Sequence, residues 1–381
     1  MFKNMKNIIV LIFVYIFIAT LLFACQSTNK SFTQNEEKYY VEQIYDISSN
    51  GKLVLSSSYS DIKIQTWDKN EVKIYGEIIY YDSVNKGTDT LLNIFKNIKA
   101  KSSKEKLELD LNIISNKGNS SYVISSLLKK IDKYFHKDKE STIDINNVKI
   151  AYTIWVPKNI NIQVDSKYGK IEMETIAGNV NFTLFQNDLI MENYGKSGIF
   201  NVDYSSITIG NGDTATFKIF NCNVNANEIK NTIINAQYSN INIDKTHNIS
   251  IKSFNSKFNL ATVNSLICEK SEYDNFKFDE IITDASFKKA FDTKIELNGT
   301  SSSFKNFSGN FEYGNIYIKT HPELKYNLNS KCAYGQVDVP SDKFAKFISD
   351  TQNSNTTIHG SNIETECNIE LISFSTKCKI E

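Results

Sequence analysis

The amino-acid sequence predicts an all-β protein built as a parallel β-helix-like solenoid, with a strand-rich N-terminal part and one or two short helices. The composition is the first observation, because 24 Phe and 20 Tyr against only three Pro in 381 residues favours strands. The second is the alternation of apolar and polar residues along most of the chain. The third is a short phrase that recurs at a nearly fixed spacing, which is typical of stacked repeats.

Two interleaved series of phrases define the repeat. The phrase "YSNINI" at Tyr238–Ile243 has near-copies that begin with Tyr, at steps of 34 to 40 residues. A second series begins with Phe, at steps of 34 to 37 residues. The first residues of the two series are Tyr168, Tyr204, Tyr238, Tyr273 and Tyr313, and Phe185, Phe220, Phe254 and Phe291. Together they predict rungs of about 17–18 residues paired into a unit of about 35; one turn of the stack could span either length.

Each unit carries two short apolar runs. In one unit these are Ile207/Ile209 and Phe217/Ile219, with polar Thr208 between the first two. Apolar residues at i and i+2 are expected to point inward, and the residue between them to face water. We therefore expect two strands and two turns per unit, with rungs stacked about 4.8 Å apart.

Small or turn-forming residues precede the first strand of the units. We expect them to adopt the tight or left-handed backbone of a sharp corner. They are Gly169, Ser205, Ser239, Asp274, Gly314 and Gly335. Asparagines at the next position could form side-chain ladders between rungs, or act as single turn formers. They are Asn223, Asn240, Asn275 and Asn315.

The first 24 residues read as a lipoprotein signal peptide. Lys3 and Lys6 precede an apolar run that ends in "LLFAC", and this resembles a bacterial lipobox in which Phe23 replaces the usual small residue. The resemblance implies cleavage before Cys25 and its acylation, palmitate included; an uncleaved membrane helix is the alternative. Gln26 follows in place of the Asp that retains some lipoproteins in the inner membrane. The predicted location is the cell envelope, on the outer membrane or cell surface rather than the inner membrane.

The rest of the chain divides by pattern. After the lipidated Cys and tether (25–38) comes the strand-rich N-terminal part (39–147), with a short helix expected over Asp89–Lys99 and an amphipathic helical insertion near 115–145. The solenoid repeats span 148–340. The C-terminal strands, 341–381, are expected to cap the stack.

Charge and cysteine content narrow the function. The 43 basic residues, all Lys, balance 43 acidic ones, which argues against a nucleic-acid partner. No cofactor motif is present, and neither a cofactor nor a metal is expected. Five cysteines would remain besides Cys25: Cys222, Cys268, Cys332, Cys367 and Cys378. Cys367 and Cys378 could form a disulfide across one hairpin, or all five could be free buried thiols.

Two stretches resemble a known family. "SSSYSDIKIQTWDKNEVKI" and "TIWVPKNINIQVDSKYGKIEMETIAGNVNFTL" (Thr153–Leu184) are similar to the opening strand pair and the centre of the "putative adhesin" family of bacterial cell-envelope proteins. The resemblance covers roughly residues 45–340. It implies a β-helix-like solenoid at the cell surface or in the periplasm, without catalytic residues. The insertion near 115–145 and the Lys-only, Asn-rich composition depart from the family and leave ligand and partner open.

The leading functional prediction is a non-catalytic binding, adhesin-like or scaffolding module. If Tyr168, Tyr204, Tyr238, Tyr273 and Tyr313 align, they form an aromatic stripe for a glycan or protein at the cell surface; they could equally stack at a corner and only cover the core. The alternative is a carbohydrate-active enzyme, a polysaccharide lyase or hydrolase, which needs clustered carboxylates. Its candidates are Glu172, Asp203, Asp244, Asp279 and Glu296.

Overall fold

The computed structural model describes residues 36–80, 95–96, 98–112, 148–363 and 365–381. These residues form 24 strands in one hydrogen-bonded, mostly parallel sheet, so the predicted all-β class is confirmed. The strands of the N-terminal end are β1 (Glu37–Asp46), β2 (Lys52–Ser58), β3 (Asp61–Trp67), β4 (Glu71–Tyr80), β5 (Lys99–Ser102), β6 (Lys106–Asp110) and β7 (Val148–Pro157).

The middle strands carry the repeated phrases. They are β8 (Asn161–Met173), β9 (Val180–Asn193), β10 (Ser197–Asp203), β11 (Ser206–Phe220), β12 (Asn223–Gln237), β13 (Asn240–Phe254), β14 (Lys257–Glu272), β15 (Asn275–Phe291), β16 (Lys294–Leu297), β17 (Asn306–Glu312) and β18 (Asn315–Ile318). The last are β19 (Asn327–Ala333), β20 (Gln336–Asp338), β21 (Lys346–Gln352), β22 (Asn355–Ser361), β23 (Asn368–Phe374) and β24 (Lys377–Ile380).

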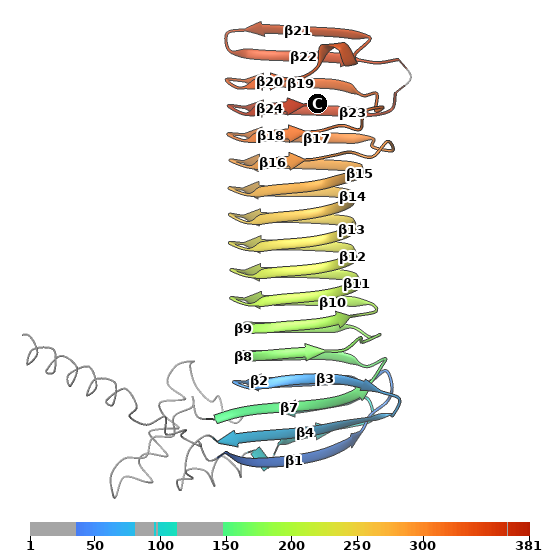
Figure 1. Cartoon of the computed structure of the whole chain (residues 1–381), viewed down its shortest axis with the longest axis vertical. Helices are drawn as coiled ribbons and strands as arrows, with labels where there is room; N and C mark the ends of the chain where they lie inside the picture. Colours follow the sequence, from blue (N-terminus) through green and yellow to red (C-terminus); the bar gives the residue numbers. More distant parts are fainter. Residues whose placement is uncertain (1–35, 81–94, 97, 113–147, 364) are drawn as a thin grey trace, which may run out of the picture.

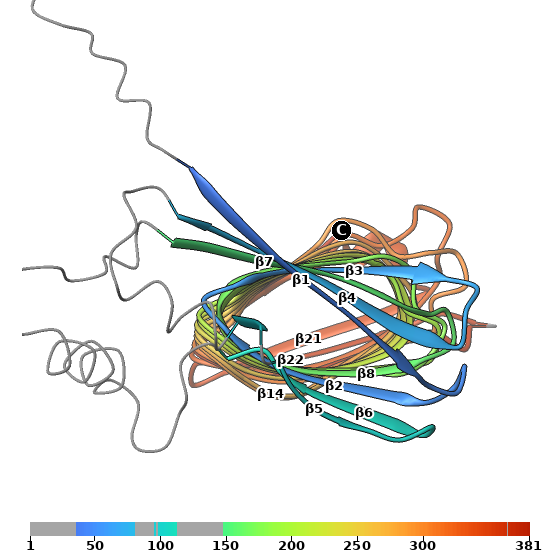
Figure 2. The same ribbon diagram turned by 90° about the horizontal axis from the view of Figure 1, so that it is seen from below.

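The strands pile up along the long axis of the molecule (Figure 1). Ile207 of β11 pairs with Val224 of β12, which pairs with Ile241 of β13, so neighbours in the stack lie 17 residues apart. The spacing lengthens toward β17, where Asp284 pairs with Asn306. The offset between paired strands therefore matches the shorter of the two lengths left open by the sequence. Seen along the axis, the strands overlie one another in a flattened ring (Figure 2).

Apolar side chains fill the inside of the stack. Ile207 and Ile209 are at most 1% exposed while Thr208 between them is exposed, as the alternation predicts. Each of β11–β15 is one continuous strand of 15–17 residues, and not two strands as expected. Between β11 and β12 the pairing skips only Gly210 and Asp213, so the ladder of hydrogen bonds continues along the whole strand. Between β13, β14 and β15 it is also interrupted by register shifts.

Both ends of the stack depart from chain order. The β2–β3 pair lies between β8 on one side and β6 and β7 on the other. At the opposite end, β23 lies between β17 and β19, and β24 lies between β18 and β20. The antiparallel pair β21–β22 follows β19 at the end of the stack (Figure 1).

Helical structure is sparse in the described residues. The one named helix is the 3-10 turn η2 (Ser341–Lys343), which the sequence reading missed. Of the helix expected over Asp89–Lys99, only Phe95 and Lys96 are described as helical, and Lys99 already belongs to β5. The insertion near 115–145 lies outside the described residues, as do Cys25 and the signal peptide. No described helix has the length and apolar character needed to cross a membrane.

Candidate functional site

A continuous column of aromatic rings, the aromatic column, runs along one edge of the stack. Successive rings from Tyr168 onward lie 5.3–5.8 Å apart between centroids, with interplanar angles of 63–82°, the favoured edge-to-face geometry. Tyr59 stacks on Tyr168 at 4.6 Å and begins the column. In spatial order the rings are Tyr59, Tyr168, Phe185, Tyr204, Phe220, Tyr238, Phe254, Tyr273, Phe291, Tyr313, Phe374 and Tyr334.

The five tyrosines singled out from the sequence thus lie in one column, alternating with phenylalanines. The sequence reading missed Tyr59, Phe374 and Tyr334. The signal was present, because "YSDIKI" follows the Tyr pattern from Tyr59, "YGQVDV" follows it from Tyr334, and "FSTKCKI" follows the Phe pattern from Phe374.

The column owes its alternation to a corner in the backbone. Phe254 is in register with Gln237, so Tyr238 stands one position further along its strand. Seven tyrosines take a left-handed backbone, with φ of 52° at both Tyr204 and Tyr238; in the phenylalanine strands the left-handed residue follows the Phe, as at Asn221. A bulky residue rarely adopts positive φ, and the cost is of order 1–3 kcal/mol.

The small residues after the tyrosines were expected to supply this left-handed backbone, and that prediction was wrong. They are small because the neighbouring strand lies against them: a Cβ on Gly169 would sit 2.2 Å from the Ser60 carbonyl oxygen. Ser205 and Ser239 at the same position are buried. The Ser239 hydroxyl donates to the Gln237 carbonyl at 2.8 Å and accepts from the Cys222 amide at 3.1 Å. Buried hydrogen bonds therefore tie consecutive corners together.

Asp274 is the ionisable member of this corner series. Its carboxylate is 3% exposed and accepts hydrogen bonds from the Ser253 and Ser271 hydroxyls and from the Ser256 and Glu272 amides, at 2.6–3.0 Å. Burial raises the pKa of Asp274 above its ordinary value, and the four donors oppose that rise. All four donors are protein groups of the corner and its neighbouring strands, so we assign Asp274 a structural role.

Six of the seven tyrosine rings are half in water. Their exposed fractions range from 38% at Tyr168 to 67% at Tyr334, while Tyr59 at the start of the column is less exposed. The column phenylalanines between Phe185 and Phe291 are less exposed. Since the tyrosines mostly recur at every second strand, they project about 10 Å apart along a straight edge.

Asparagine ladders cross an outward face of the stack. Asn240 donates to Asn223 at 3.0 Å, which confirms the ladder for one predicted pair. Asn259, Asn242 and Asn225 form a longer ladder that was not foreseen. These amides satisfy one another, and we assign them to the stability of the stack.

Three of the five carboxylates proposed for an enzyme lie far apart or in different columns. Glu172 and Glu296 occupy the same outward column but are separated by seven pairing steps, about 34 Å at ~4.8 Å per step. Glycosidase carboxyl pairs lie about 5–9.5 Å apart. Asp203 is in register with Phe220 and belongs to a different column. The described residues also hold no group of three or more His, Cys, Asp or Glu able to bind a metal.

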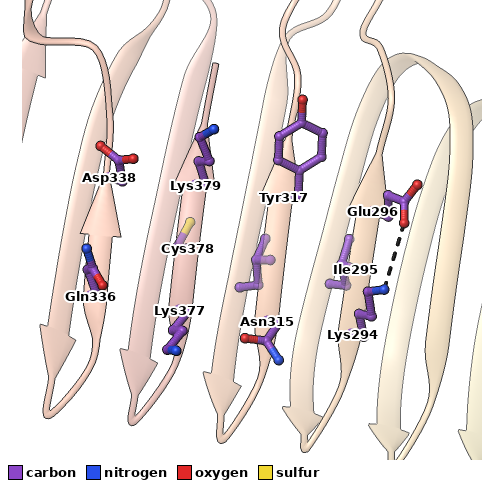
Figure 3. A pocket seen from close by; sticks show the side chains of 11 residues that line it. Lys294, Ile295, Glu296, Asn315, Tyr317, Gln336, Asp338, Lys377, Cys378 and Lys379 are labelled. Atoms are coloured by element: carbon purple, nitrogen blue, oxygen red, sulfur yellow. Dashed lines mark ion pairs between the residues drawn. The ribbon is translucent and has the colours of Figure 1, made fainter.

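A hollow of 350 Å³ lies over β16, β18, β24 and β20 (Figure 3). Lys294 and Glu296 face each other across 3.9 Å at its edge, and the Tyr317 hydroxyl donates to Glu381 at 2.7 Å. The side chains of Ile295 and Cys378 point into the core, so backbone forms the floor. Lys294 pairs with Glu296 and Lys379 with Glu381, and we assign no ligand to the hollow.

All five cysteines of the described chain are free and buried. Cys367 precedes β23 and Cys378 lies in β24, and these two strands pair with others and not with each other. The hairpin disulfide is therefore wrong, and the reading as buried thiols holds.

Fold and column together define the class: an all-β protein whose long, mostly parallel sheet displays a half-exposed aromatic edge. No protein-family model matches the sequence, and no curated protein matches it either. Three solved bacterial structures show some likeness. One is described as "a putative cell adhesion protein" from Clostridium sporogenes, with 12% identity, coverage of 91% of this chain and 100% of that one, and a TM-score of 0.19.

The second is "a putative adhesin" from Bacteroides fragilis, with 10% identity, coverage of 91% and 98%, and a TM-score of 0.23. The third is a "putative lipid binding protein" from Parabacteroides distasonis, with 9% identity, coverage of 92% and 98%, and a TM-score of 0.28. At these values the likenesses carry no function over to this chain.

Proposed function

We propose that this chain is a lipid-anchored, non-catalytic binding module of the bacterial cell envelope, adhesin-like or scaffolding in role. In this proposal the stack is a parallel β-helix-like solenoid, a form supported by the 17-residue offset between paired strands. Its anchor is the acylated Cys25, and its location is the outer membrane or cell surface. The observation that carries the proposal is the half-exposed aromatic column.

The backbone at the corner explains why the tyrosines point to binding. Asn221 and Asn255 adopt the same left-handed backbone in neighbouring strands, and Asn tolerates it better than Tyr. The left-handed backbone at this corner therefore does not require a tyrosine. A tyrosine is explained instead by the exposed ring that it presents for binding. Contacts with the phenylalanines hold each ring in place, so little side-chain entropy is lost when a partner binds.

The column also limits the shape of the ligand. Exposed rings about 10 Å apart along a straight edge suit an extended chain that can touch several of them. Aromatic rings pack on the apolar faces of sugars and serve as anchors for proteins. We therefore assign the site to an extended glycan or protein segment.

The test is a glycan and host-matrix binding screen with the wild-type chain and a variant carrying Tyr204→Ala, Tyr238→Ala and Tyr273→Ala. We expect binding to a hit to be lost in the variant. The matched control changes Ile199, Ile233 and Ile267 to Ala, three exposed apolar residues whose registers place them at every second strand of another column.

Circular dichroism and thermal unfolding would establish that both variants are folded. Binding that survives the tyrosine changes would remove the aromatic column from the function. Loss in the isoleucine variant alone would move the binding site to that face.

A further inference from the structure

The last two strands fill a slot inside the stack. β23 pairs in parallel with β17 through Ser308–Glu370 and with β19 through Asn329–Glu370. β24 likewise pairs with β18 and β20. Both slot walls therefore belong to chain that precedes β23, so the slot can form only if its middle is left for the C-terminal segment.

Without that segment, the slot presents two facing strand edges. Unpaired edges of this kind are templates for a strand from another chain, as in donor-strand and domain-swapped assemblies. The segment that best matches the slot is the one now in it. A second copy of the chain carries an identical segment, with the same parallel register and the same inward-facing Ile369, Leu371 and Cys378.

The contact between β23 and its neighbour β19, called the seam below, contains buried polar groups without hydrogen-bond partners. Four buried side-chain oxygens of the described residues lack a hydrogen-bond partner, and three of them belong to Tyr326, Ser330 and Ser373. Ser330 lies in β19 and Ser373 in β23, on strands that pair with each other, and Tyr326 directly precedes β19. A buried hydroxyl without a hydrogen-bond partner is destabilising, so this seam is less stable than the middle of the stack.

We propose that β23–β24 is an exchangeable segment, and that two copies of this chain form a dimer by inserting it reciprocally into each other's slot. The connection between Ser361 and Asn368 serves as the hinge. In the closed monomer this connection only has to cross β19. On one side of β19, Gly360 of β22 pairs with Leu328, and on the other side Asn368 of β23 pairs with Asn327. Six residues extend to about 20 Å, which lets the segment reach a neighbouring copy at this end.

The experiment traps the exchange with cysteines placed on outward-facing, paired positions. One full-length chain carries Ser308→Cys, and another carries Glu370→Cys. The two are mixed, incubated with mild denaturant, returned to native buffer and oxidised. Exchange holds the two new thiols side by side in one slot, so we expect a covalent species at twice the 43.4 kDa chain mass on a non-reducing gel, in excess of the background from chance collisions.

The matched control uses Asn231→Cys and Asn248→Cys, paired positions of β12 and β13 in the middle of the stack. Mixing these two chains should give no such species, since neither strand can leave its place. The double variant with both Ser308→Cys and Glu370→Cys should crosslink within one chain when it is never unfolded.

Absence of the mixed species, or an equal amount in the control, would overturn the proposal. Failure of the double variant to crosslink would overturn it too, because the register of the slot would then be wrong. A mixed species confined to the Ser308/Glu370 pair supports exchange. The binding screen of the aromatic column is independent of this result.

Discussion

Asp274 shows at the level of one residue how the corner balances desolvation against hydrogen bonding. Its neighbours in the corner series are Ser256 and Thr293, whose hydroxyls donate hydrogen bonds to backbone carbonyl oxygens. Asp274 cannot donate when ionised, and instead gathers four donors around one buried charge. The raised pKa means that burial outweighs these donors.

Asp274→Asn should change the pH dependence of stability. A carboxyl whose pKa is raised by folding binds its proton more tightly in the folded chain, so its contribution to the free energy of unfolding grows as pH falls toward the ordinary value of 3.8. The difference in unfolding free energy between wild type and Asp274→Asn should therefore shift in favour of wild type on acidification. Urea titrations from pH 7 to pH 4 measure it.

Asp244→Asn, which removes an exposed carboxyl, is the control for loss of one charge. A shift in the opposite direction for Asp274→Asn would mean that the four hydrogen bonds outweigh desolvation.

At the level of the strand, close approach at the corner sets the sequence. Gly169 of β8 lies against the backbone of Ser60, beside β3, with no space for a side chain. We expect Gly169→Ala to lower the free energy of unfolding by about 1–3 kcal/mol, because the neighbouring backbone must shift. The control is Gly299→Ala, where the nearest atom to an added Cβ is 3.3 Å away.

Urea denaturation of both variants measures the two losses. Equal losses would show that the close approach at Gly169 does not decide the residue there.

The strands were largely predictable from local pattern, and the corners were not. Alternation around Ile207 and Ile209 gave the inward face, because burial follows the period of two. The position of the left-handed residue could not be predicted from the sequence, because it differs between the two series of phrases. In the Tyr series it is the tyrosine itself, as at Tyr238, and in the Phe series it is the residue after the phenylalanine, as at Asn221. The same offset by one residue hid the fact that tyrosine and phenylalanine rings interleave in one column.

At the level of the whole molecule, the ends escaped prediction for a different reason. Insertion of β2–β3 and β23–β24 depends on pairing between residues far apart in sequence, as between Leu53 and Ile162. No local pattern encodes which strand fills a slot. The Tyr phrase at Tyr59 could still have assigned that strand pair to the stack.

The membrane attachment proposed for this chain should depend on one residue. Cys25→Ala should move the protein from the membrane fraction to the soluble fraction and abolish its labelling with palmitate. Two or more acyl chains are needed for stable anchoring, at about 0.8 kcal/mol per buried methylene. Cys268→Ala, which removes a buried thiol, should leave both properties unchanged. Continued membrane retention of the Cys25 variant would favour an uncleaved membrane helix.

The alternation of tyrosine and phenylalanine rings restricts the number of strands that can be added to the stack without changing the contacts between rings. Tyr238 is separated from Tyr204 by 34 residues, which is two strands of the stack. Adding a single strand would put two like rings in succession, as at Tyr59 and Tyr168, where the contact changes from edge-to-face to stacked. Adding two strands preserves the pattern and lengthens the edge by about 10 Å. Duplication of about 35 residues at a time would therefore lengthen the exposed aromatic edge in fixed steps of about 10 Å without changing the contacts between its rings.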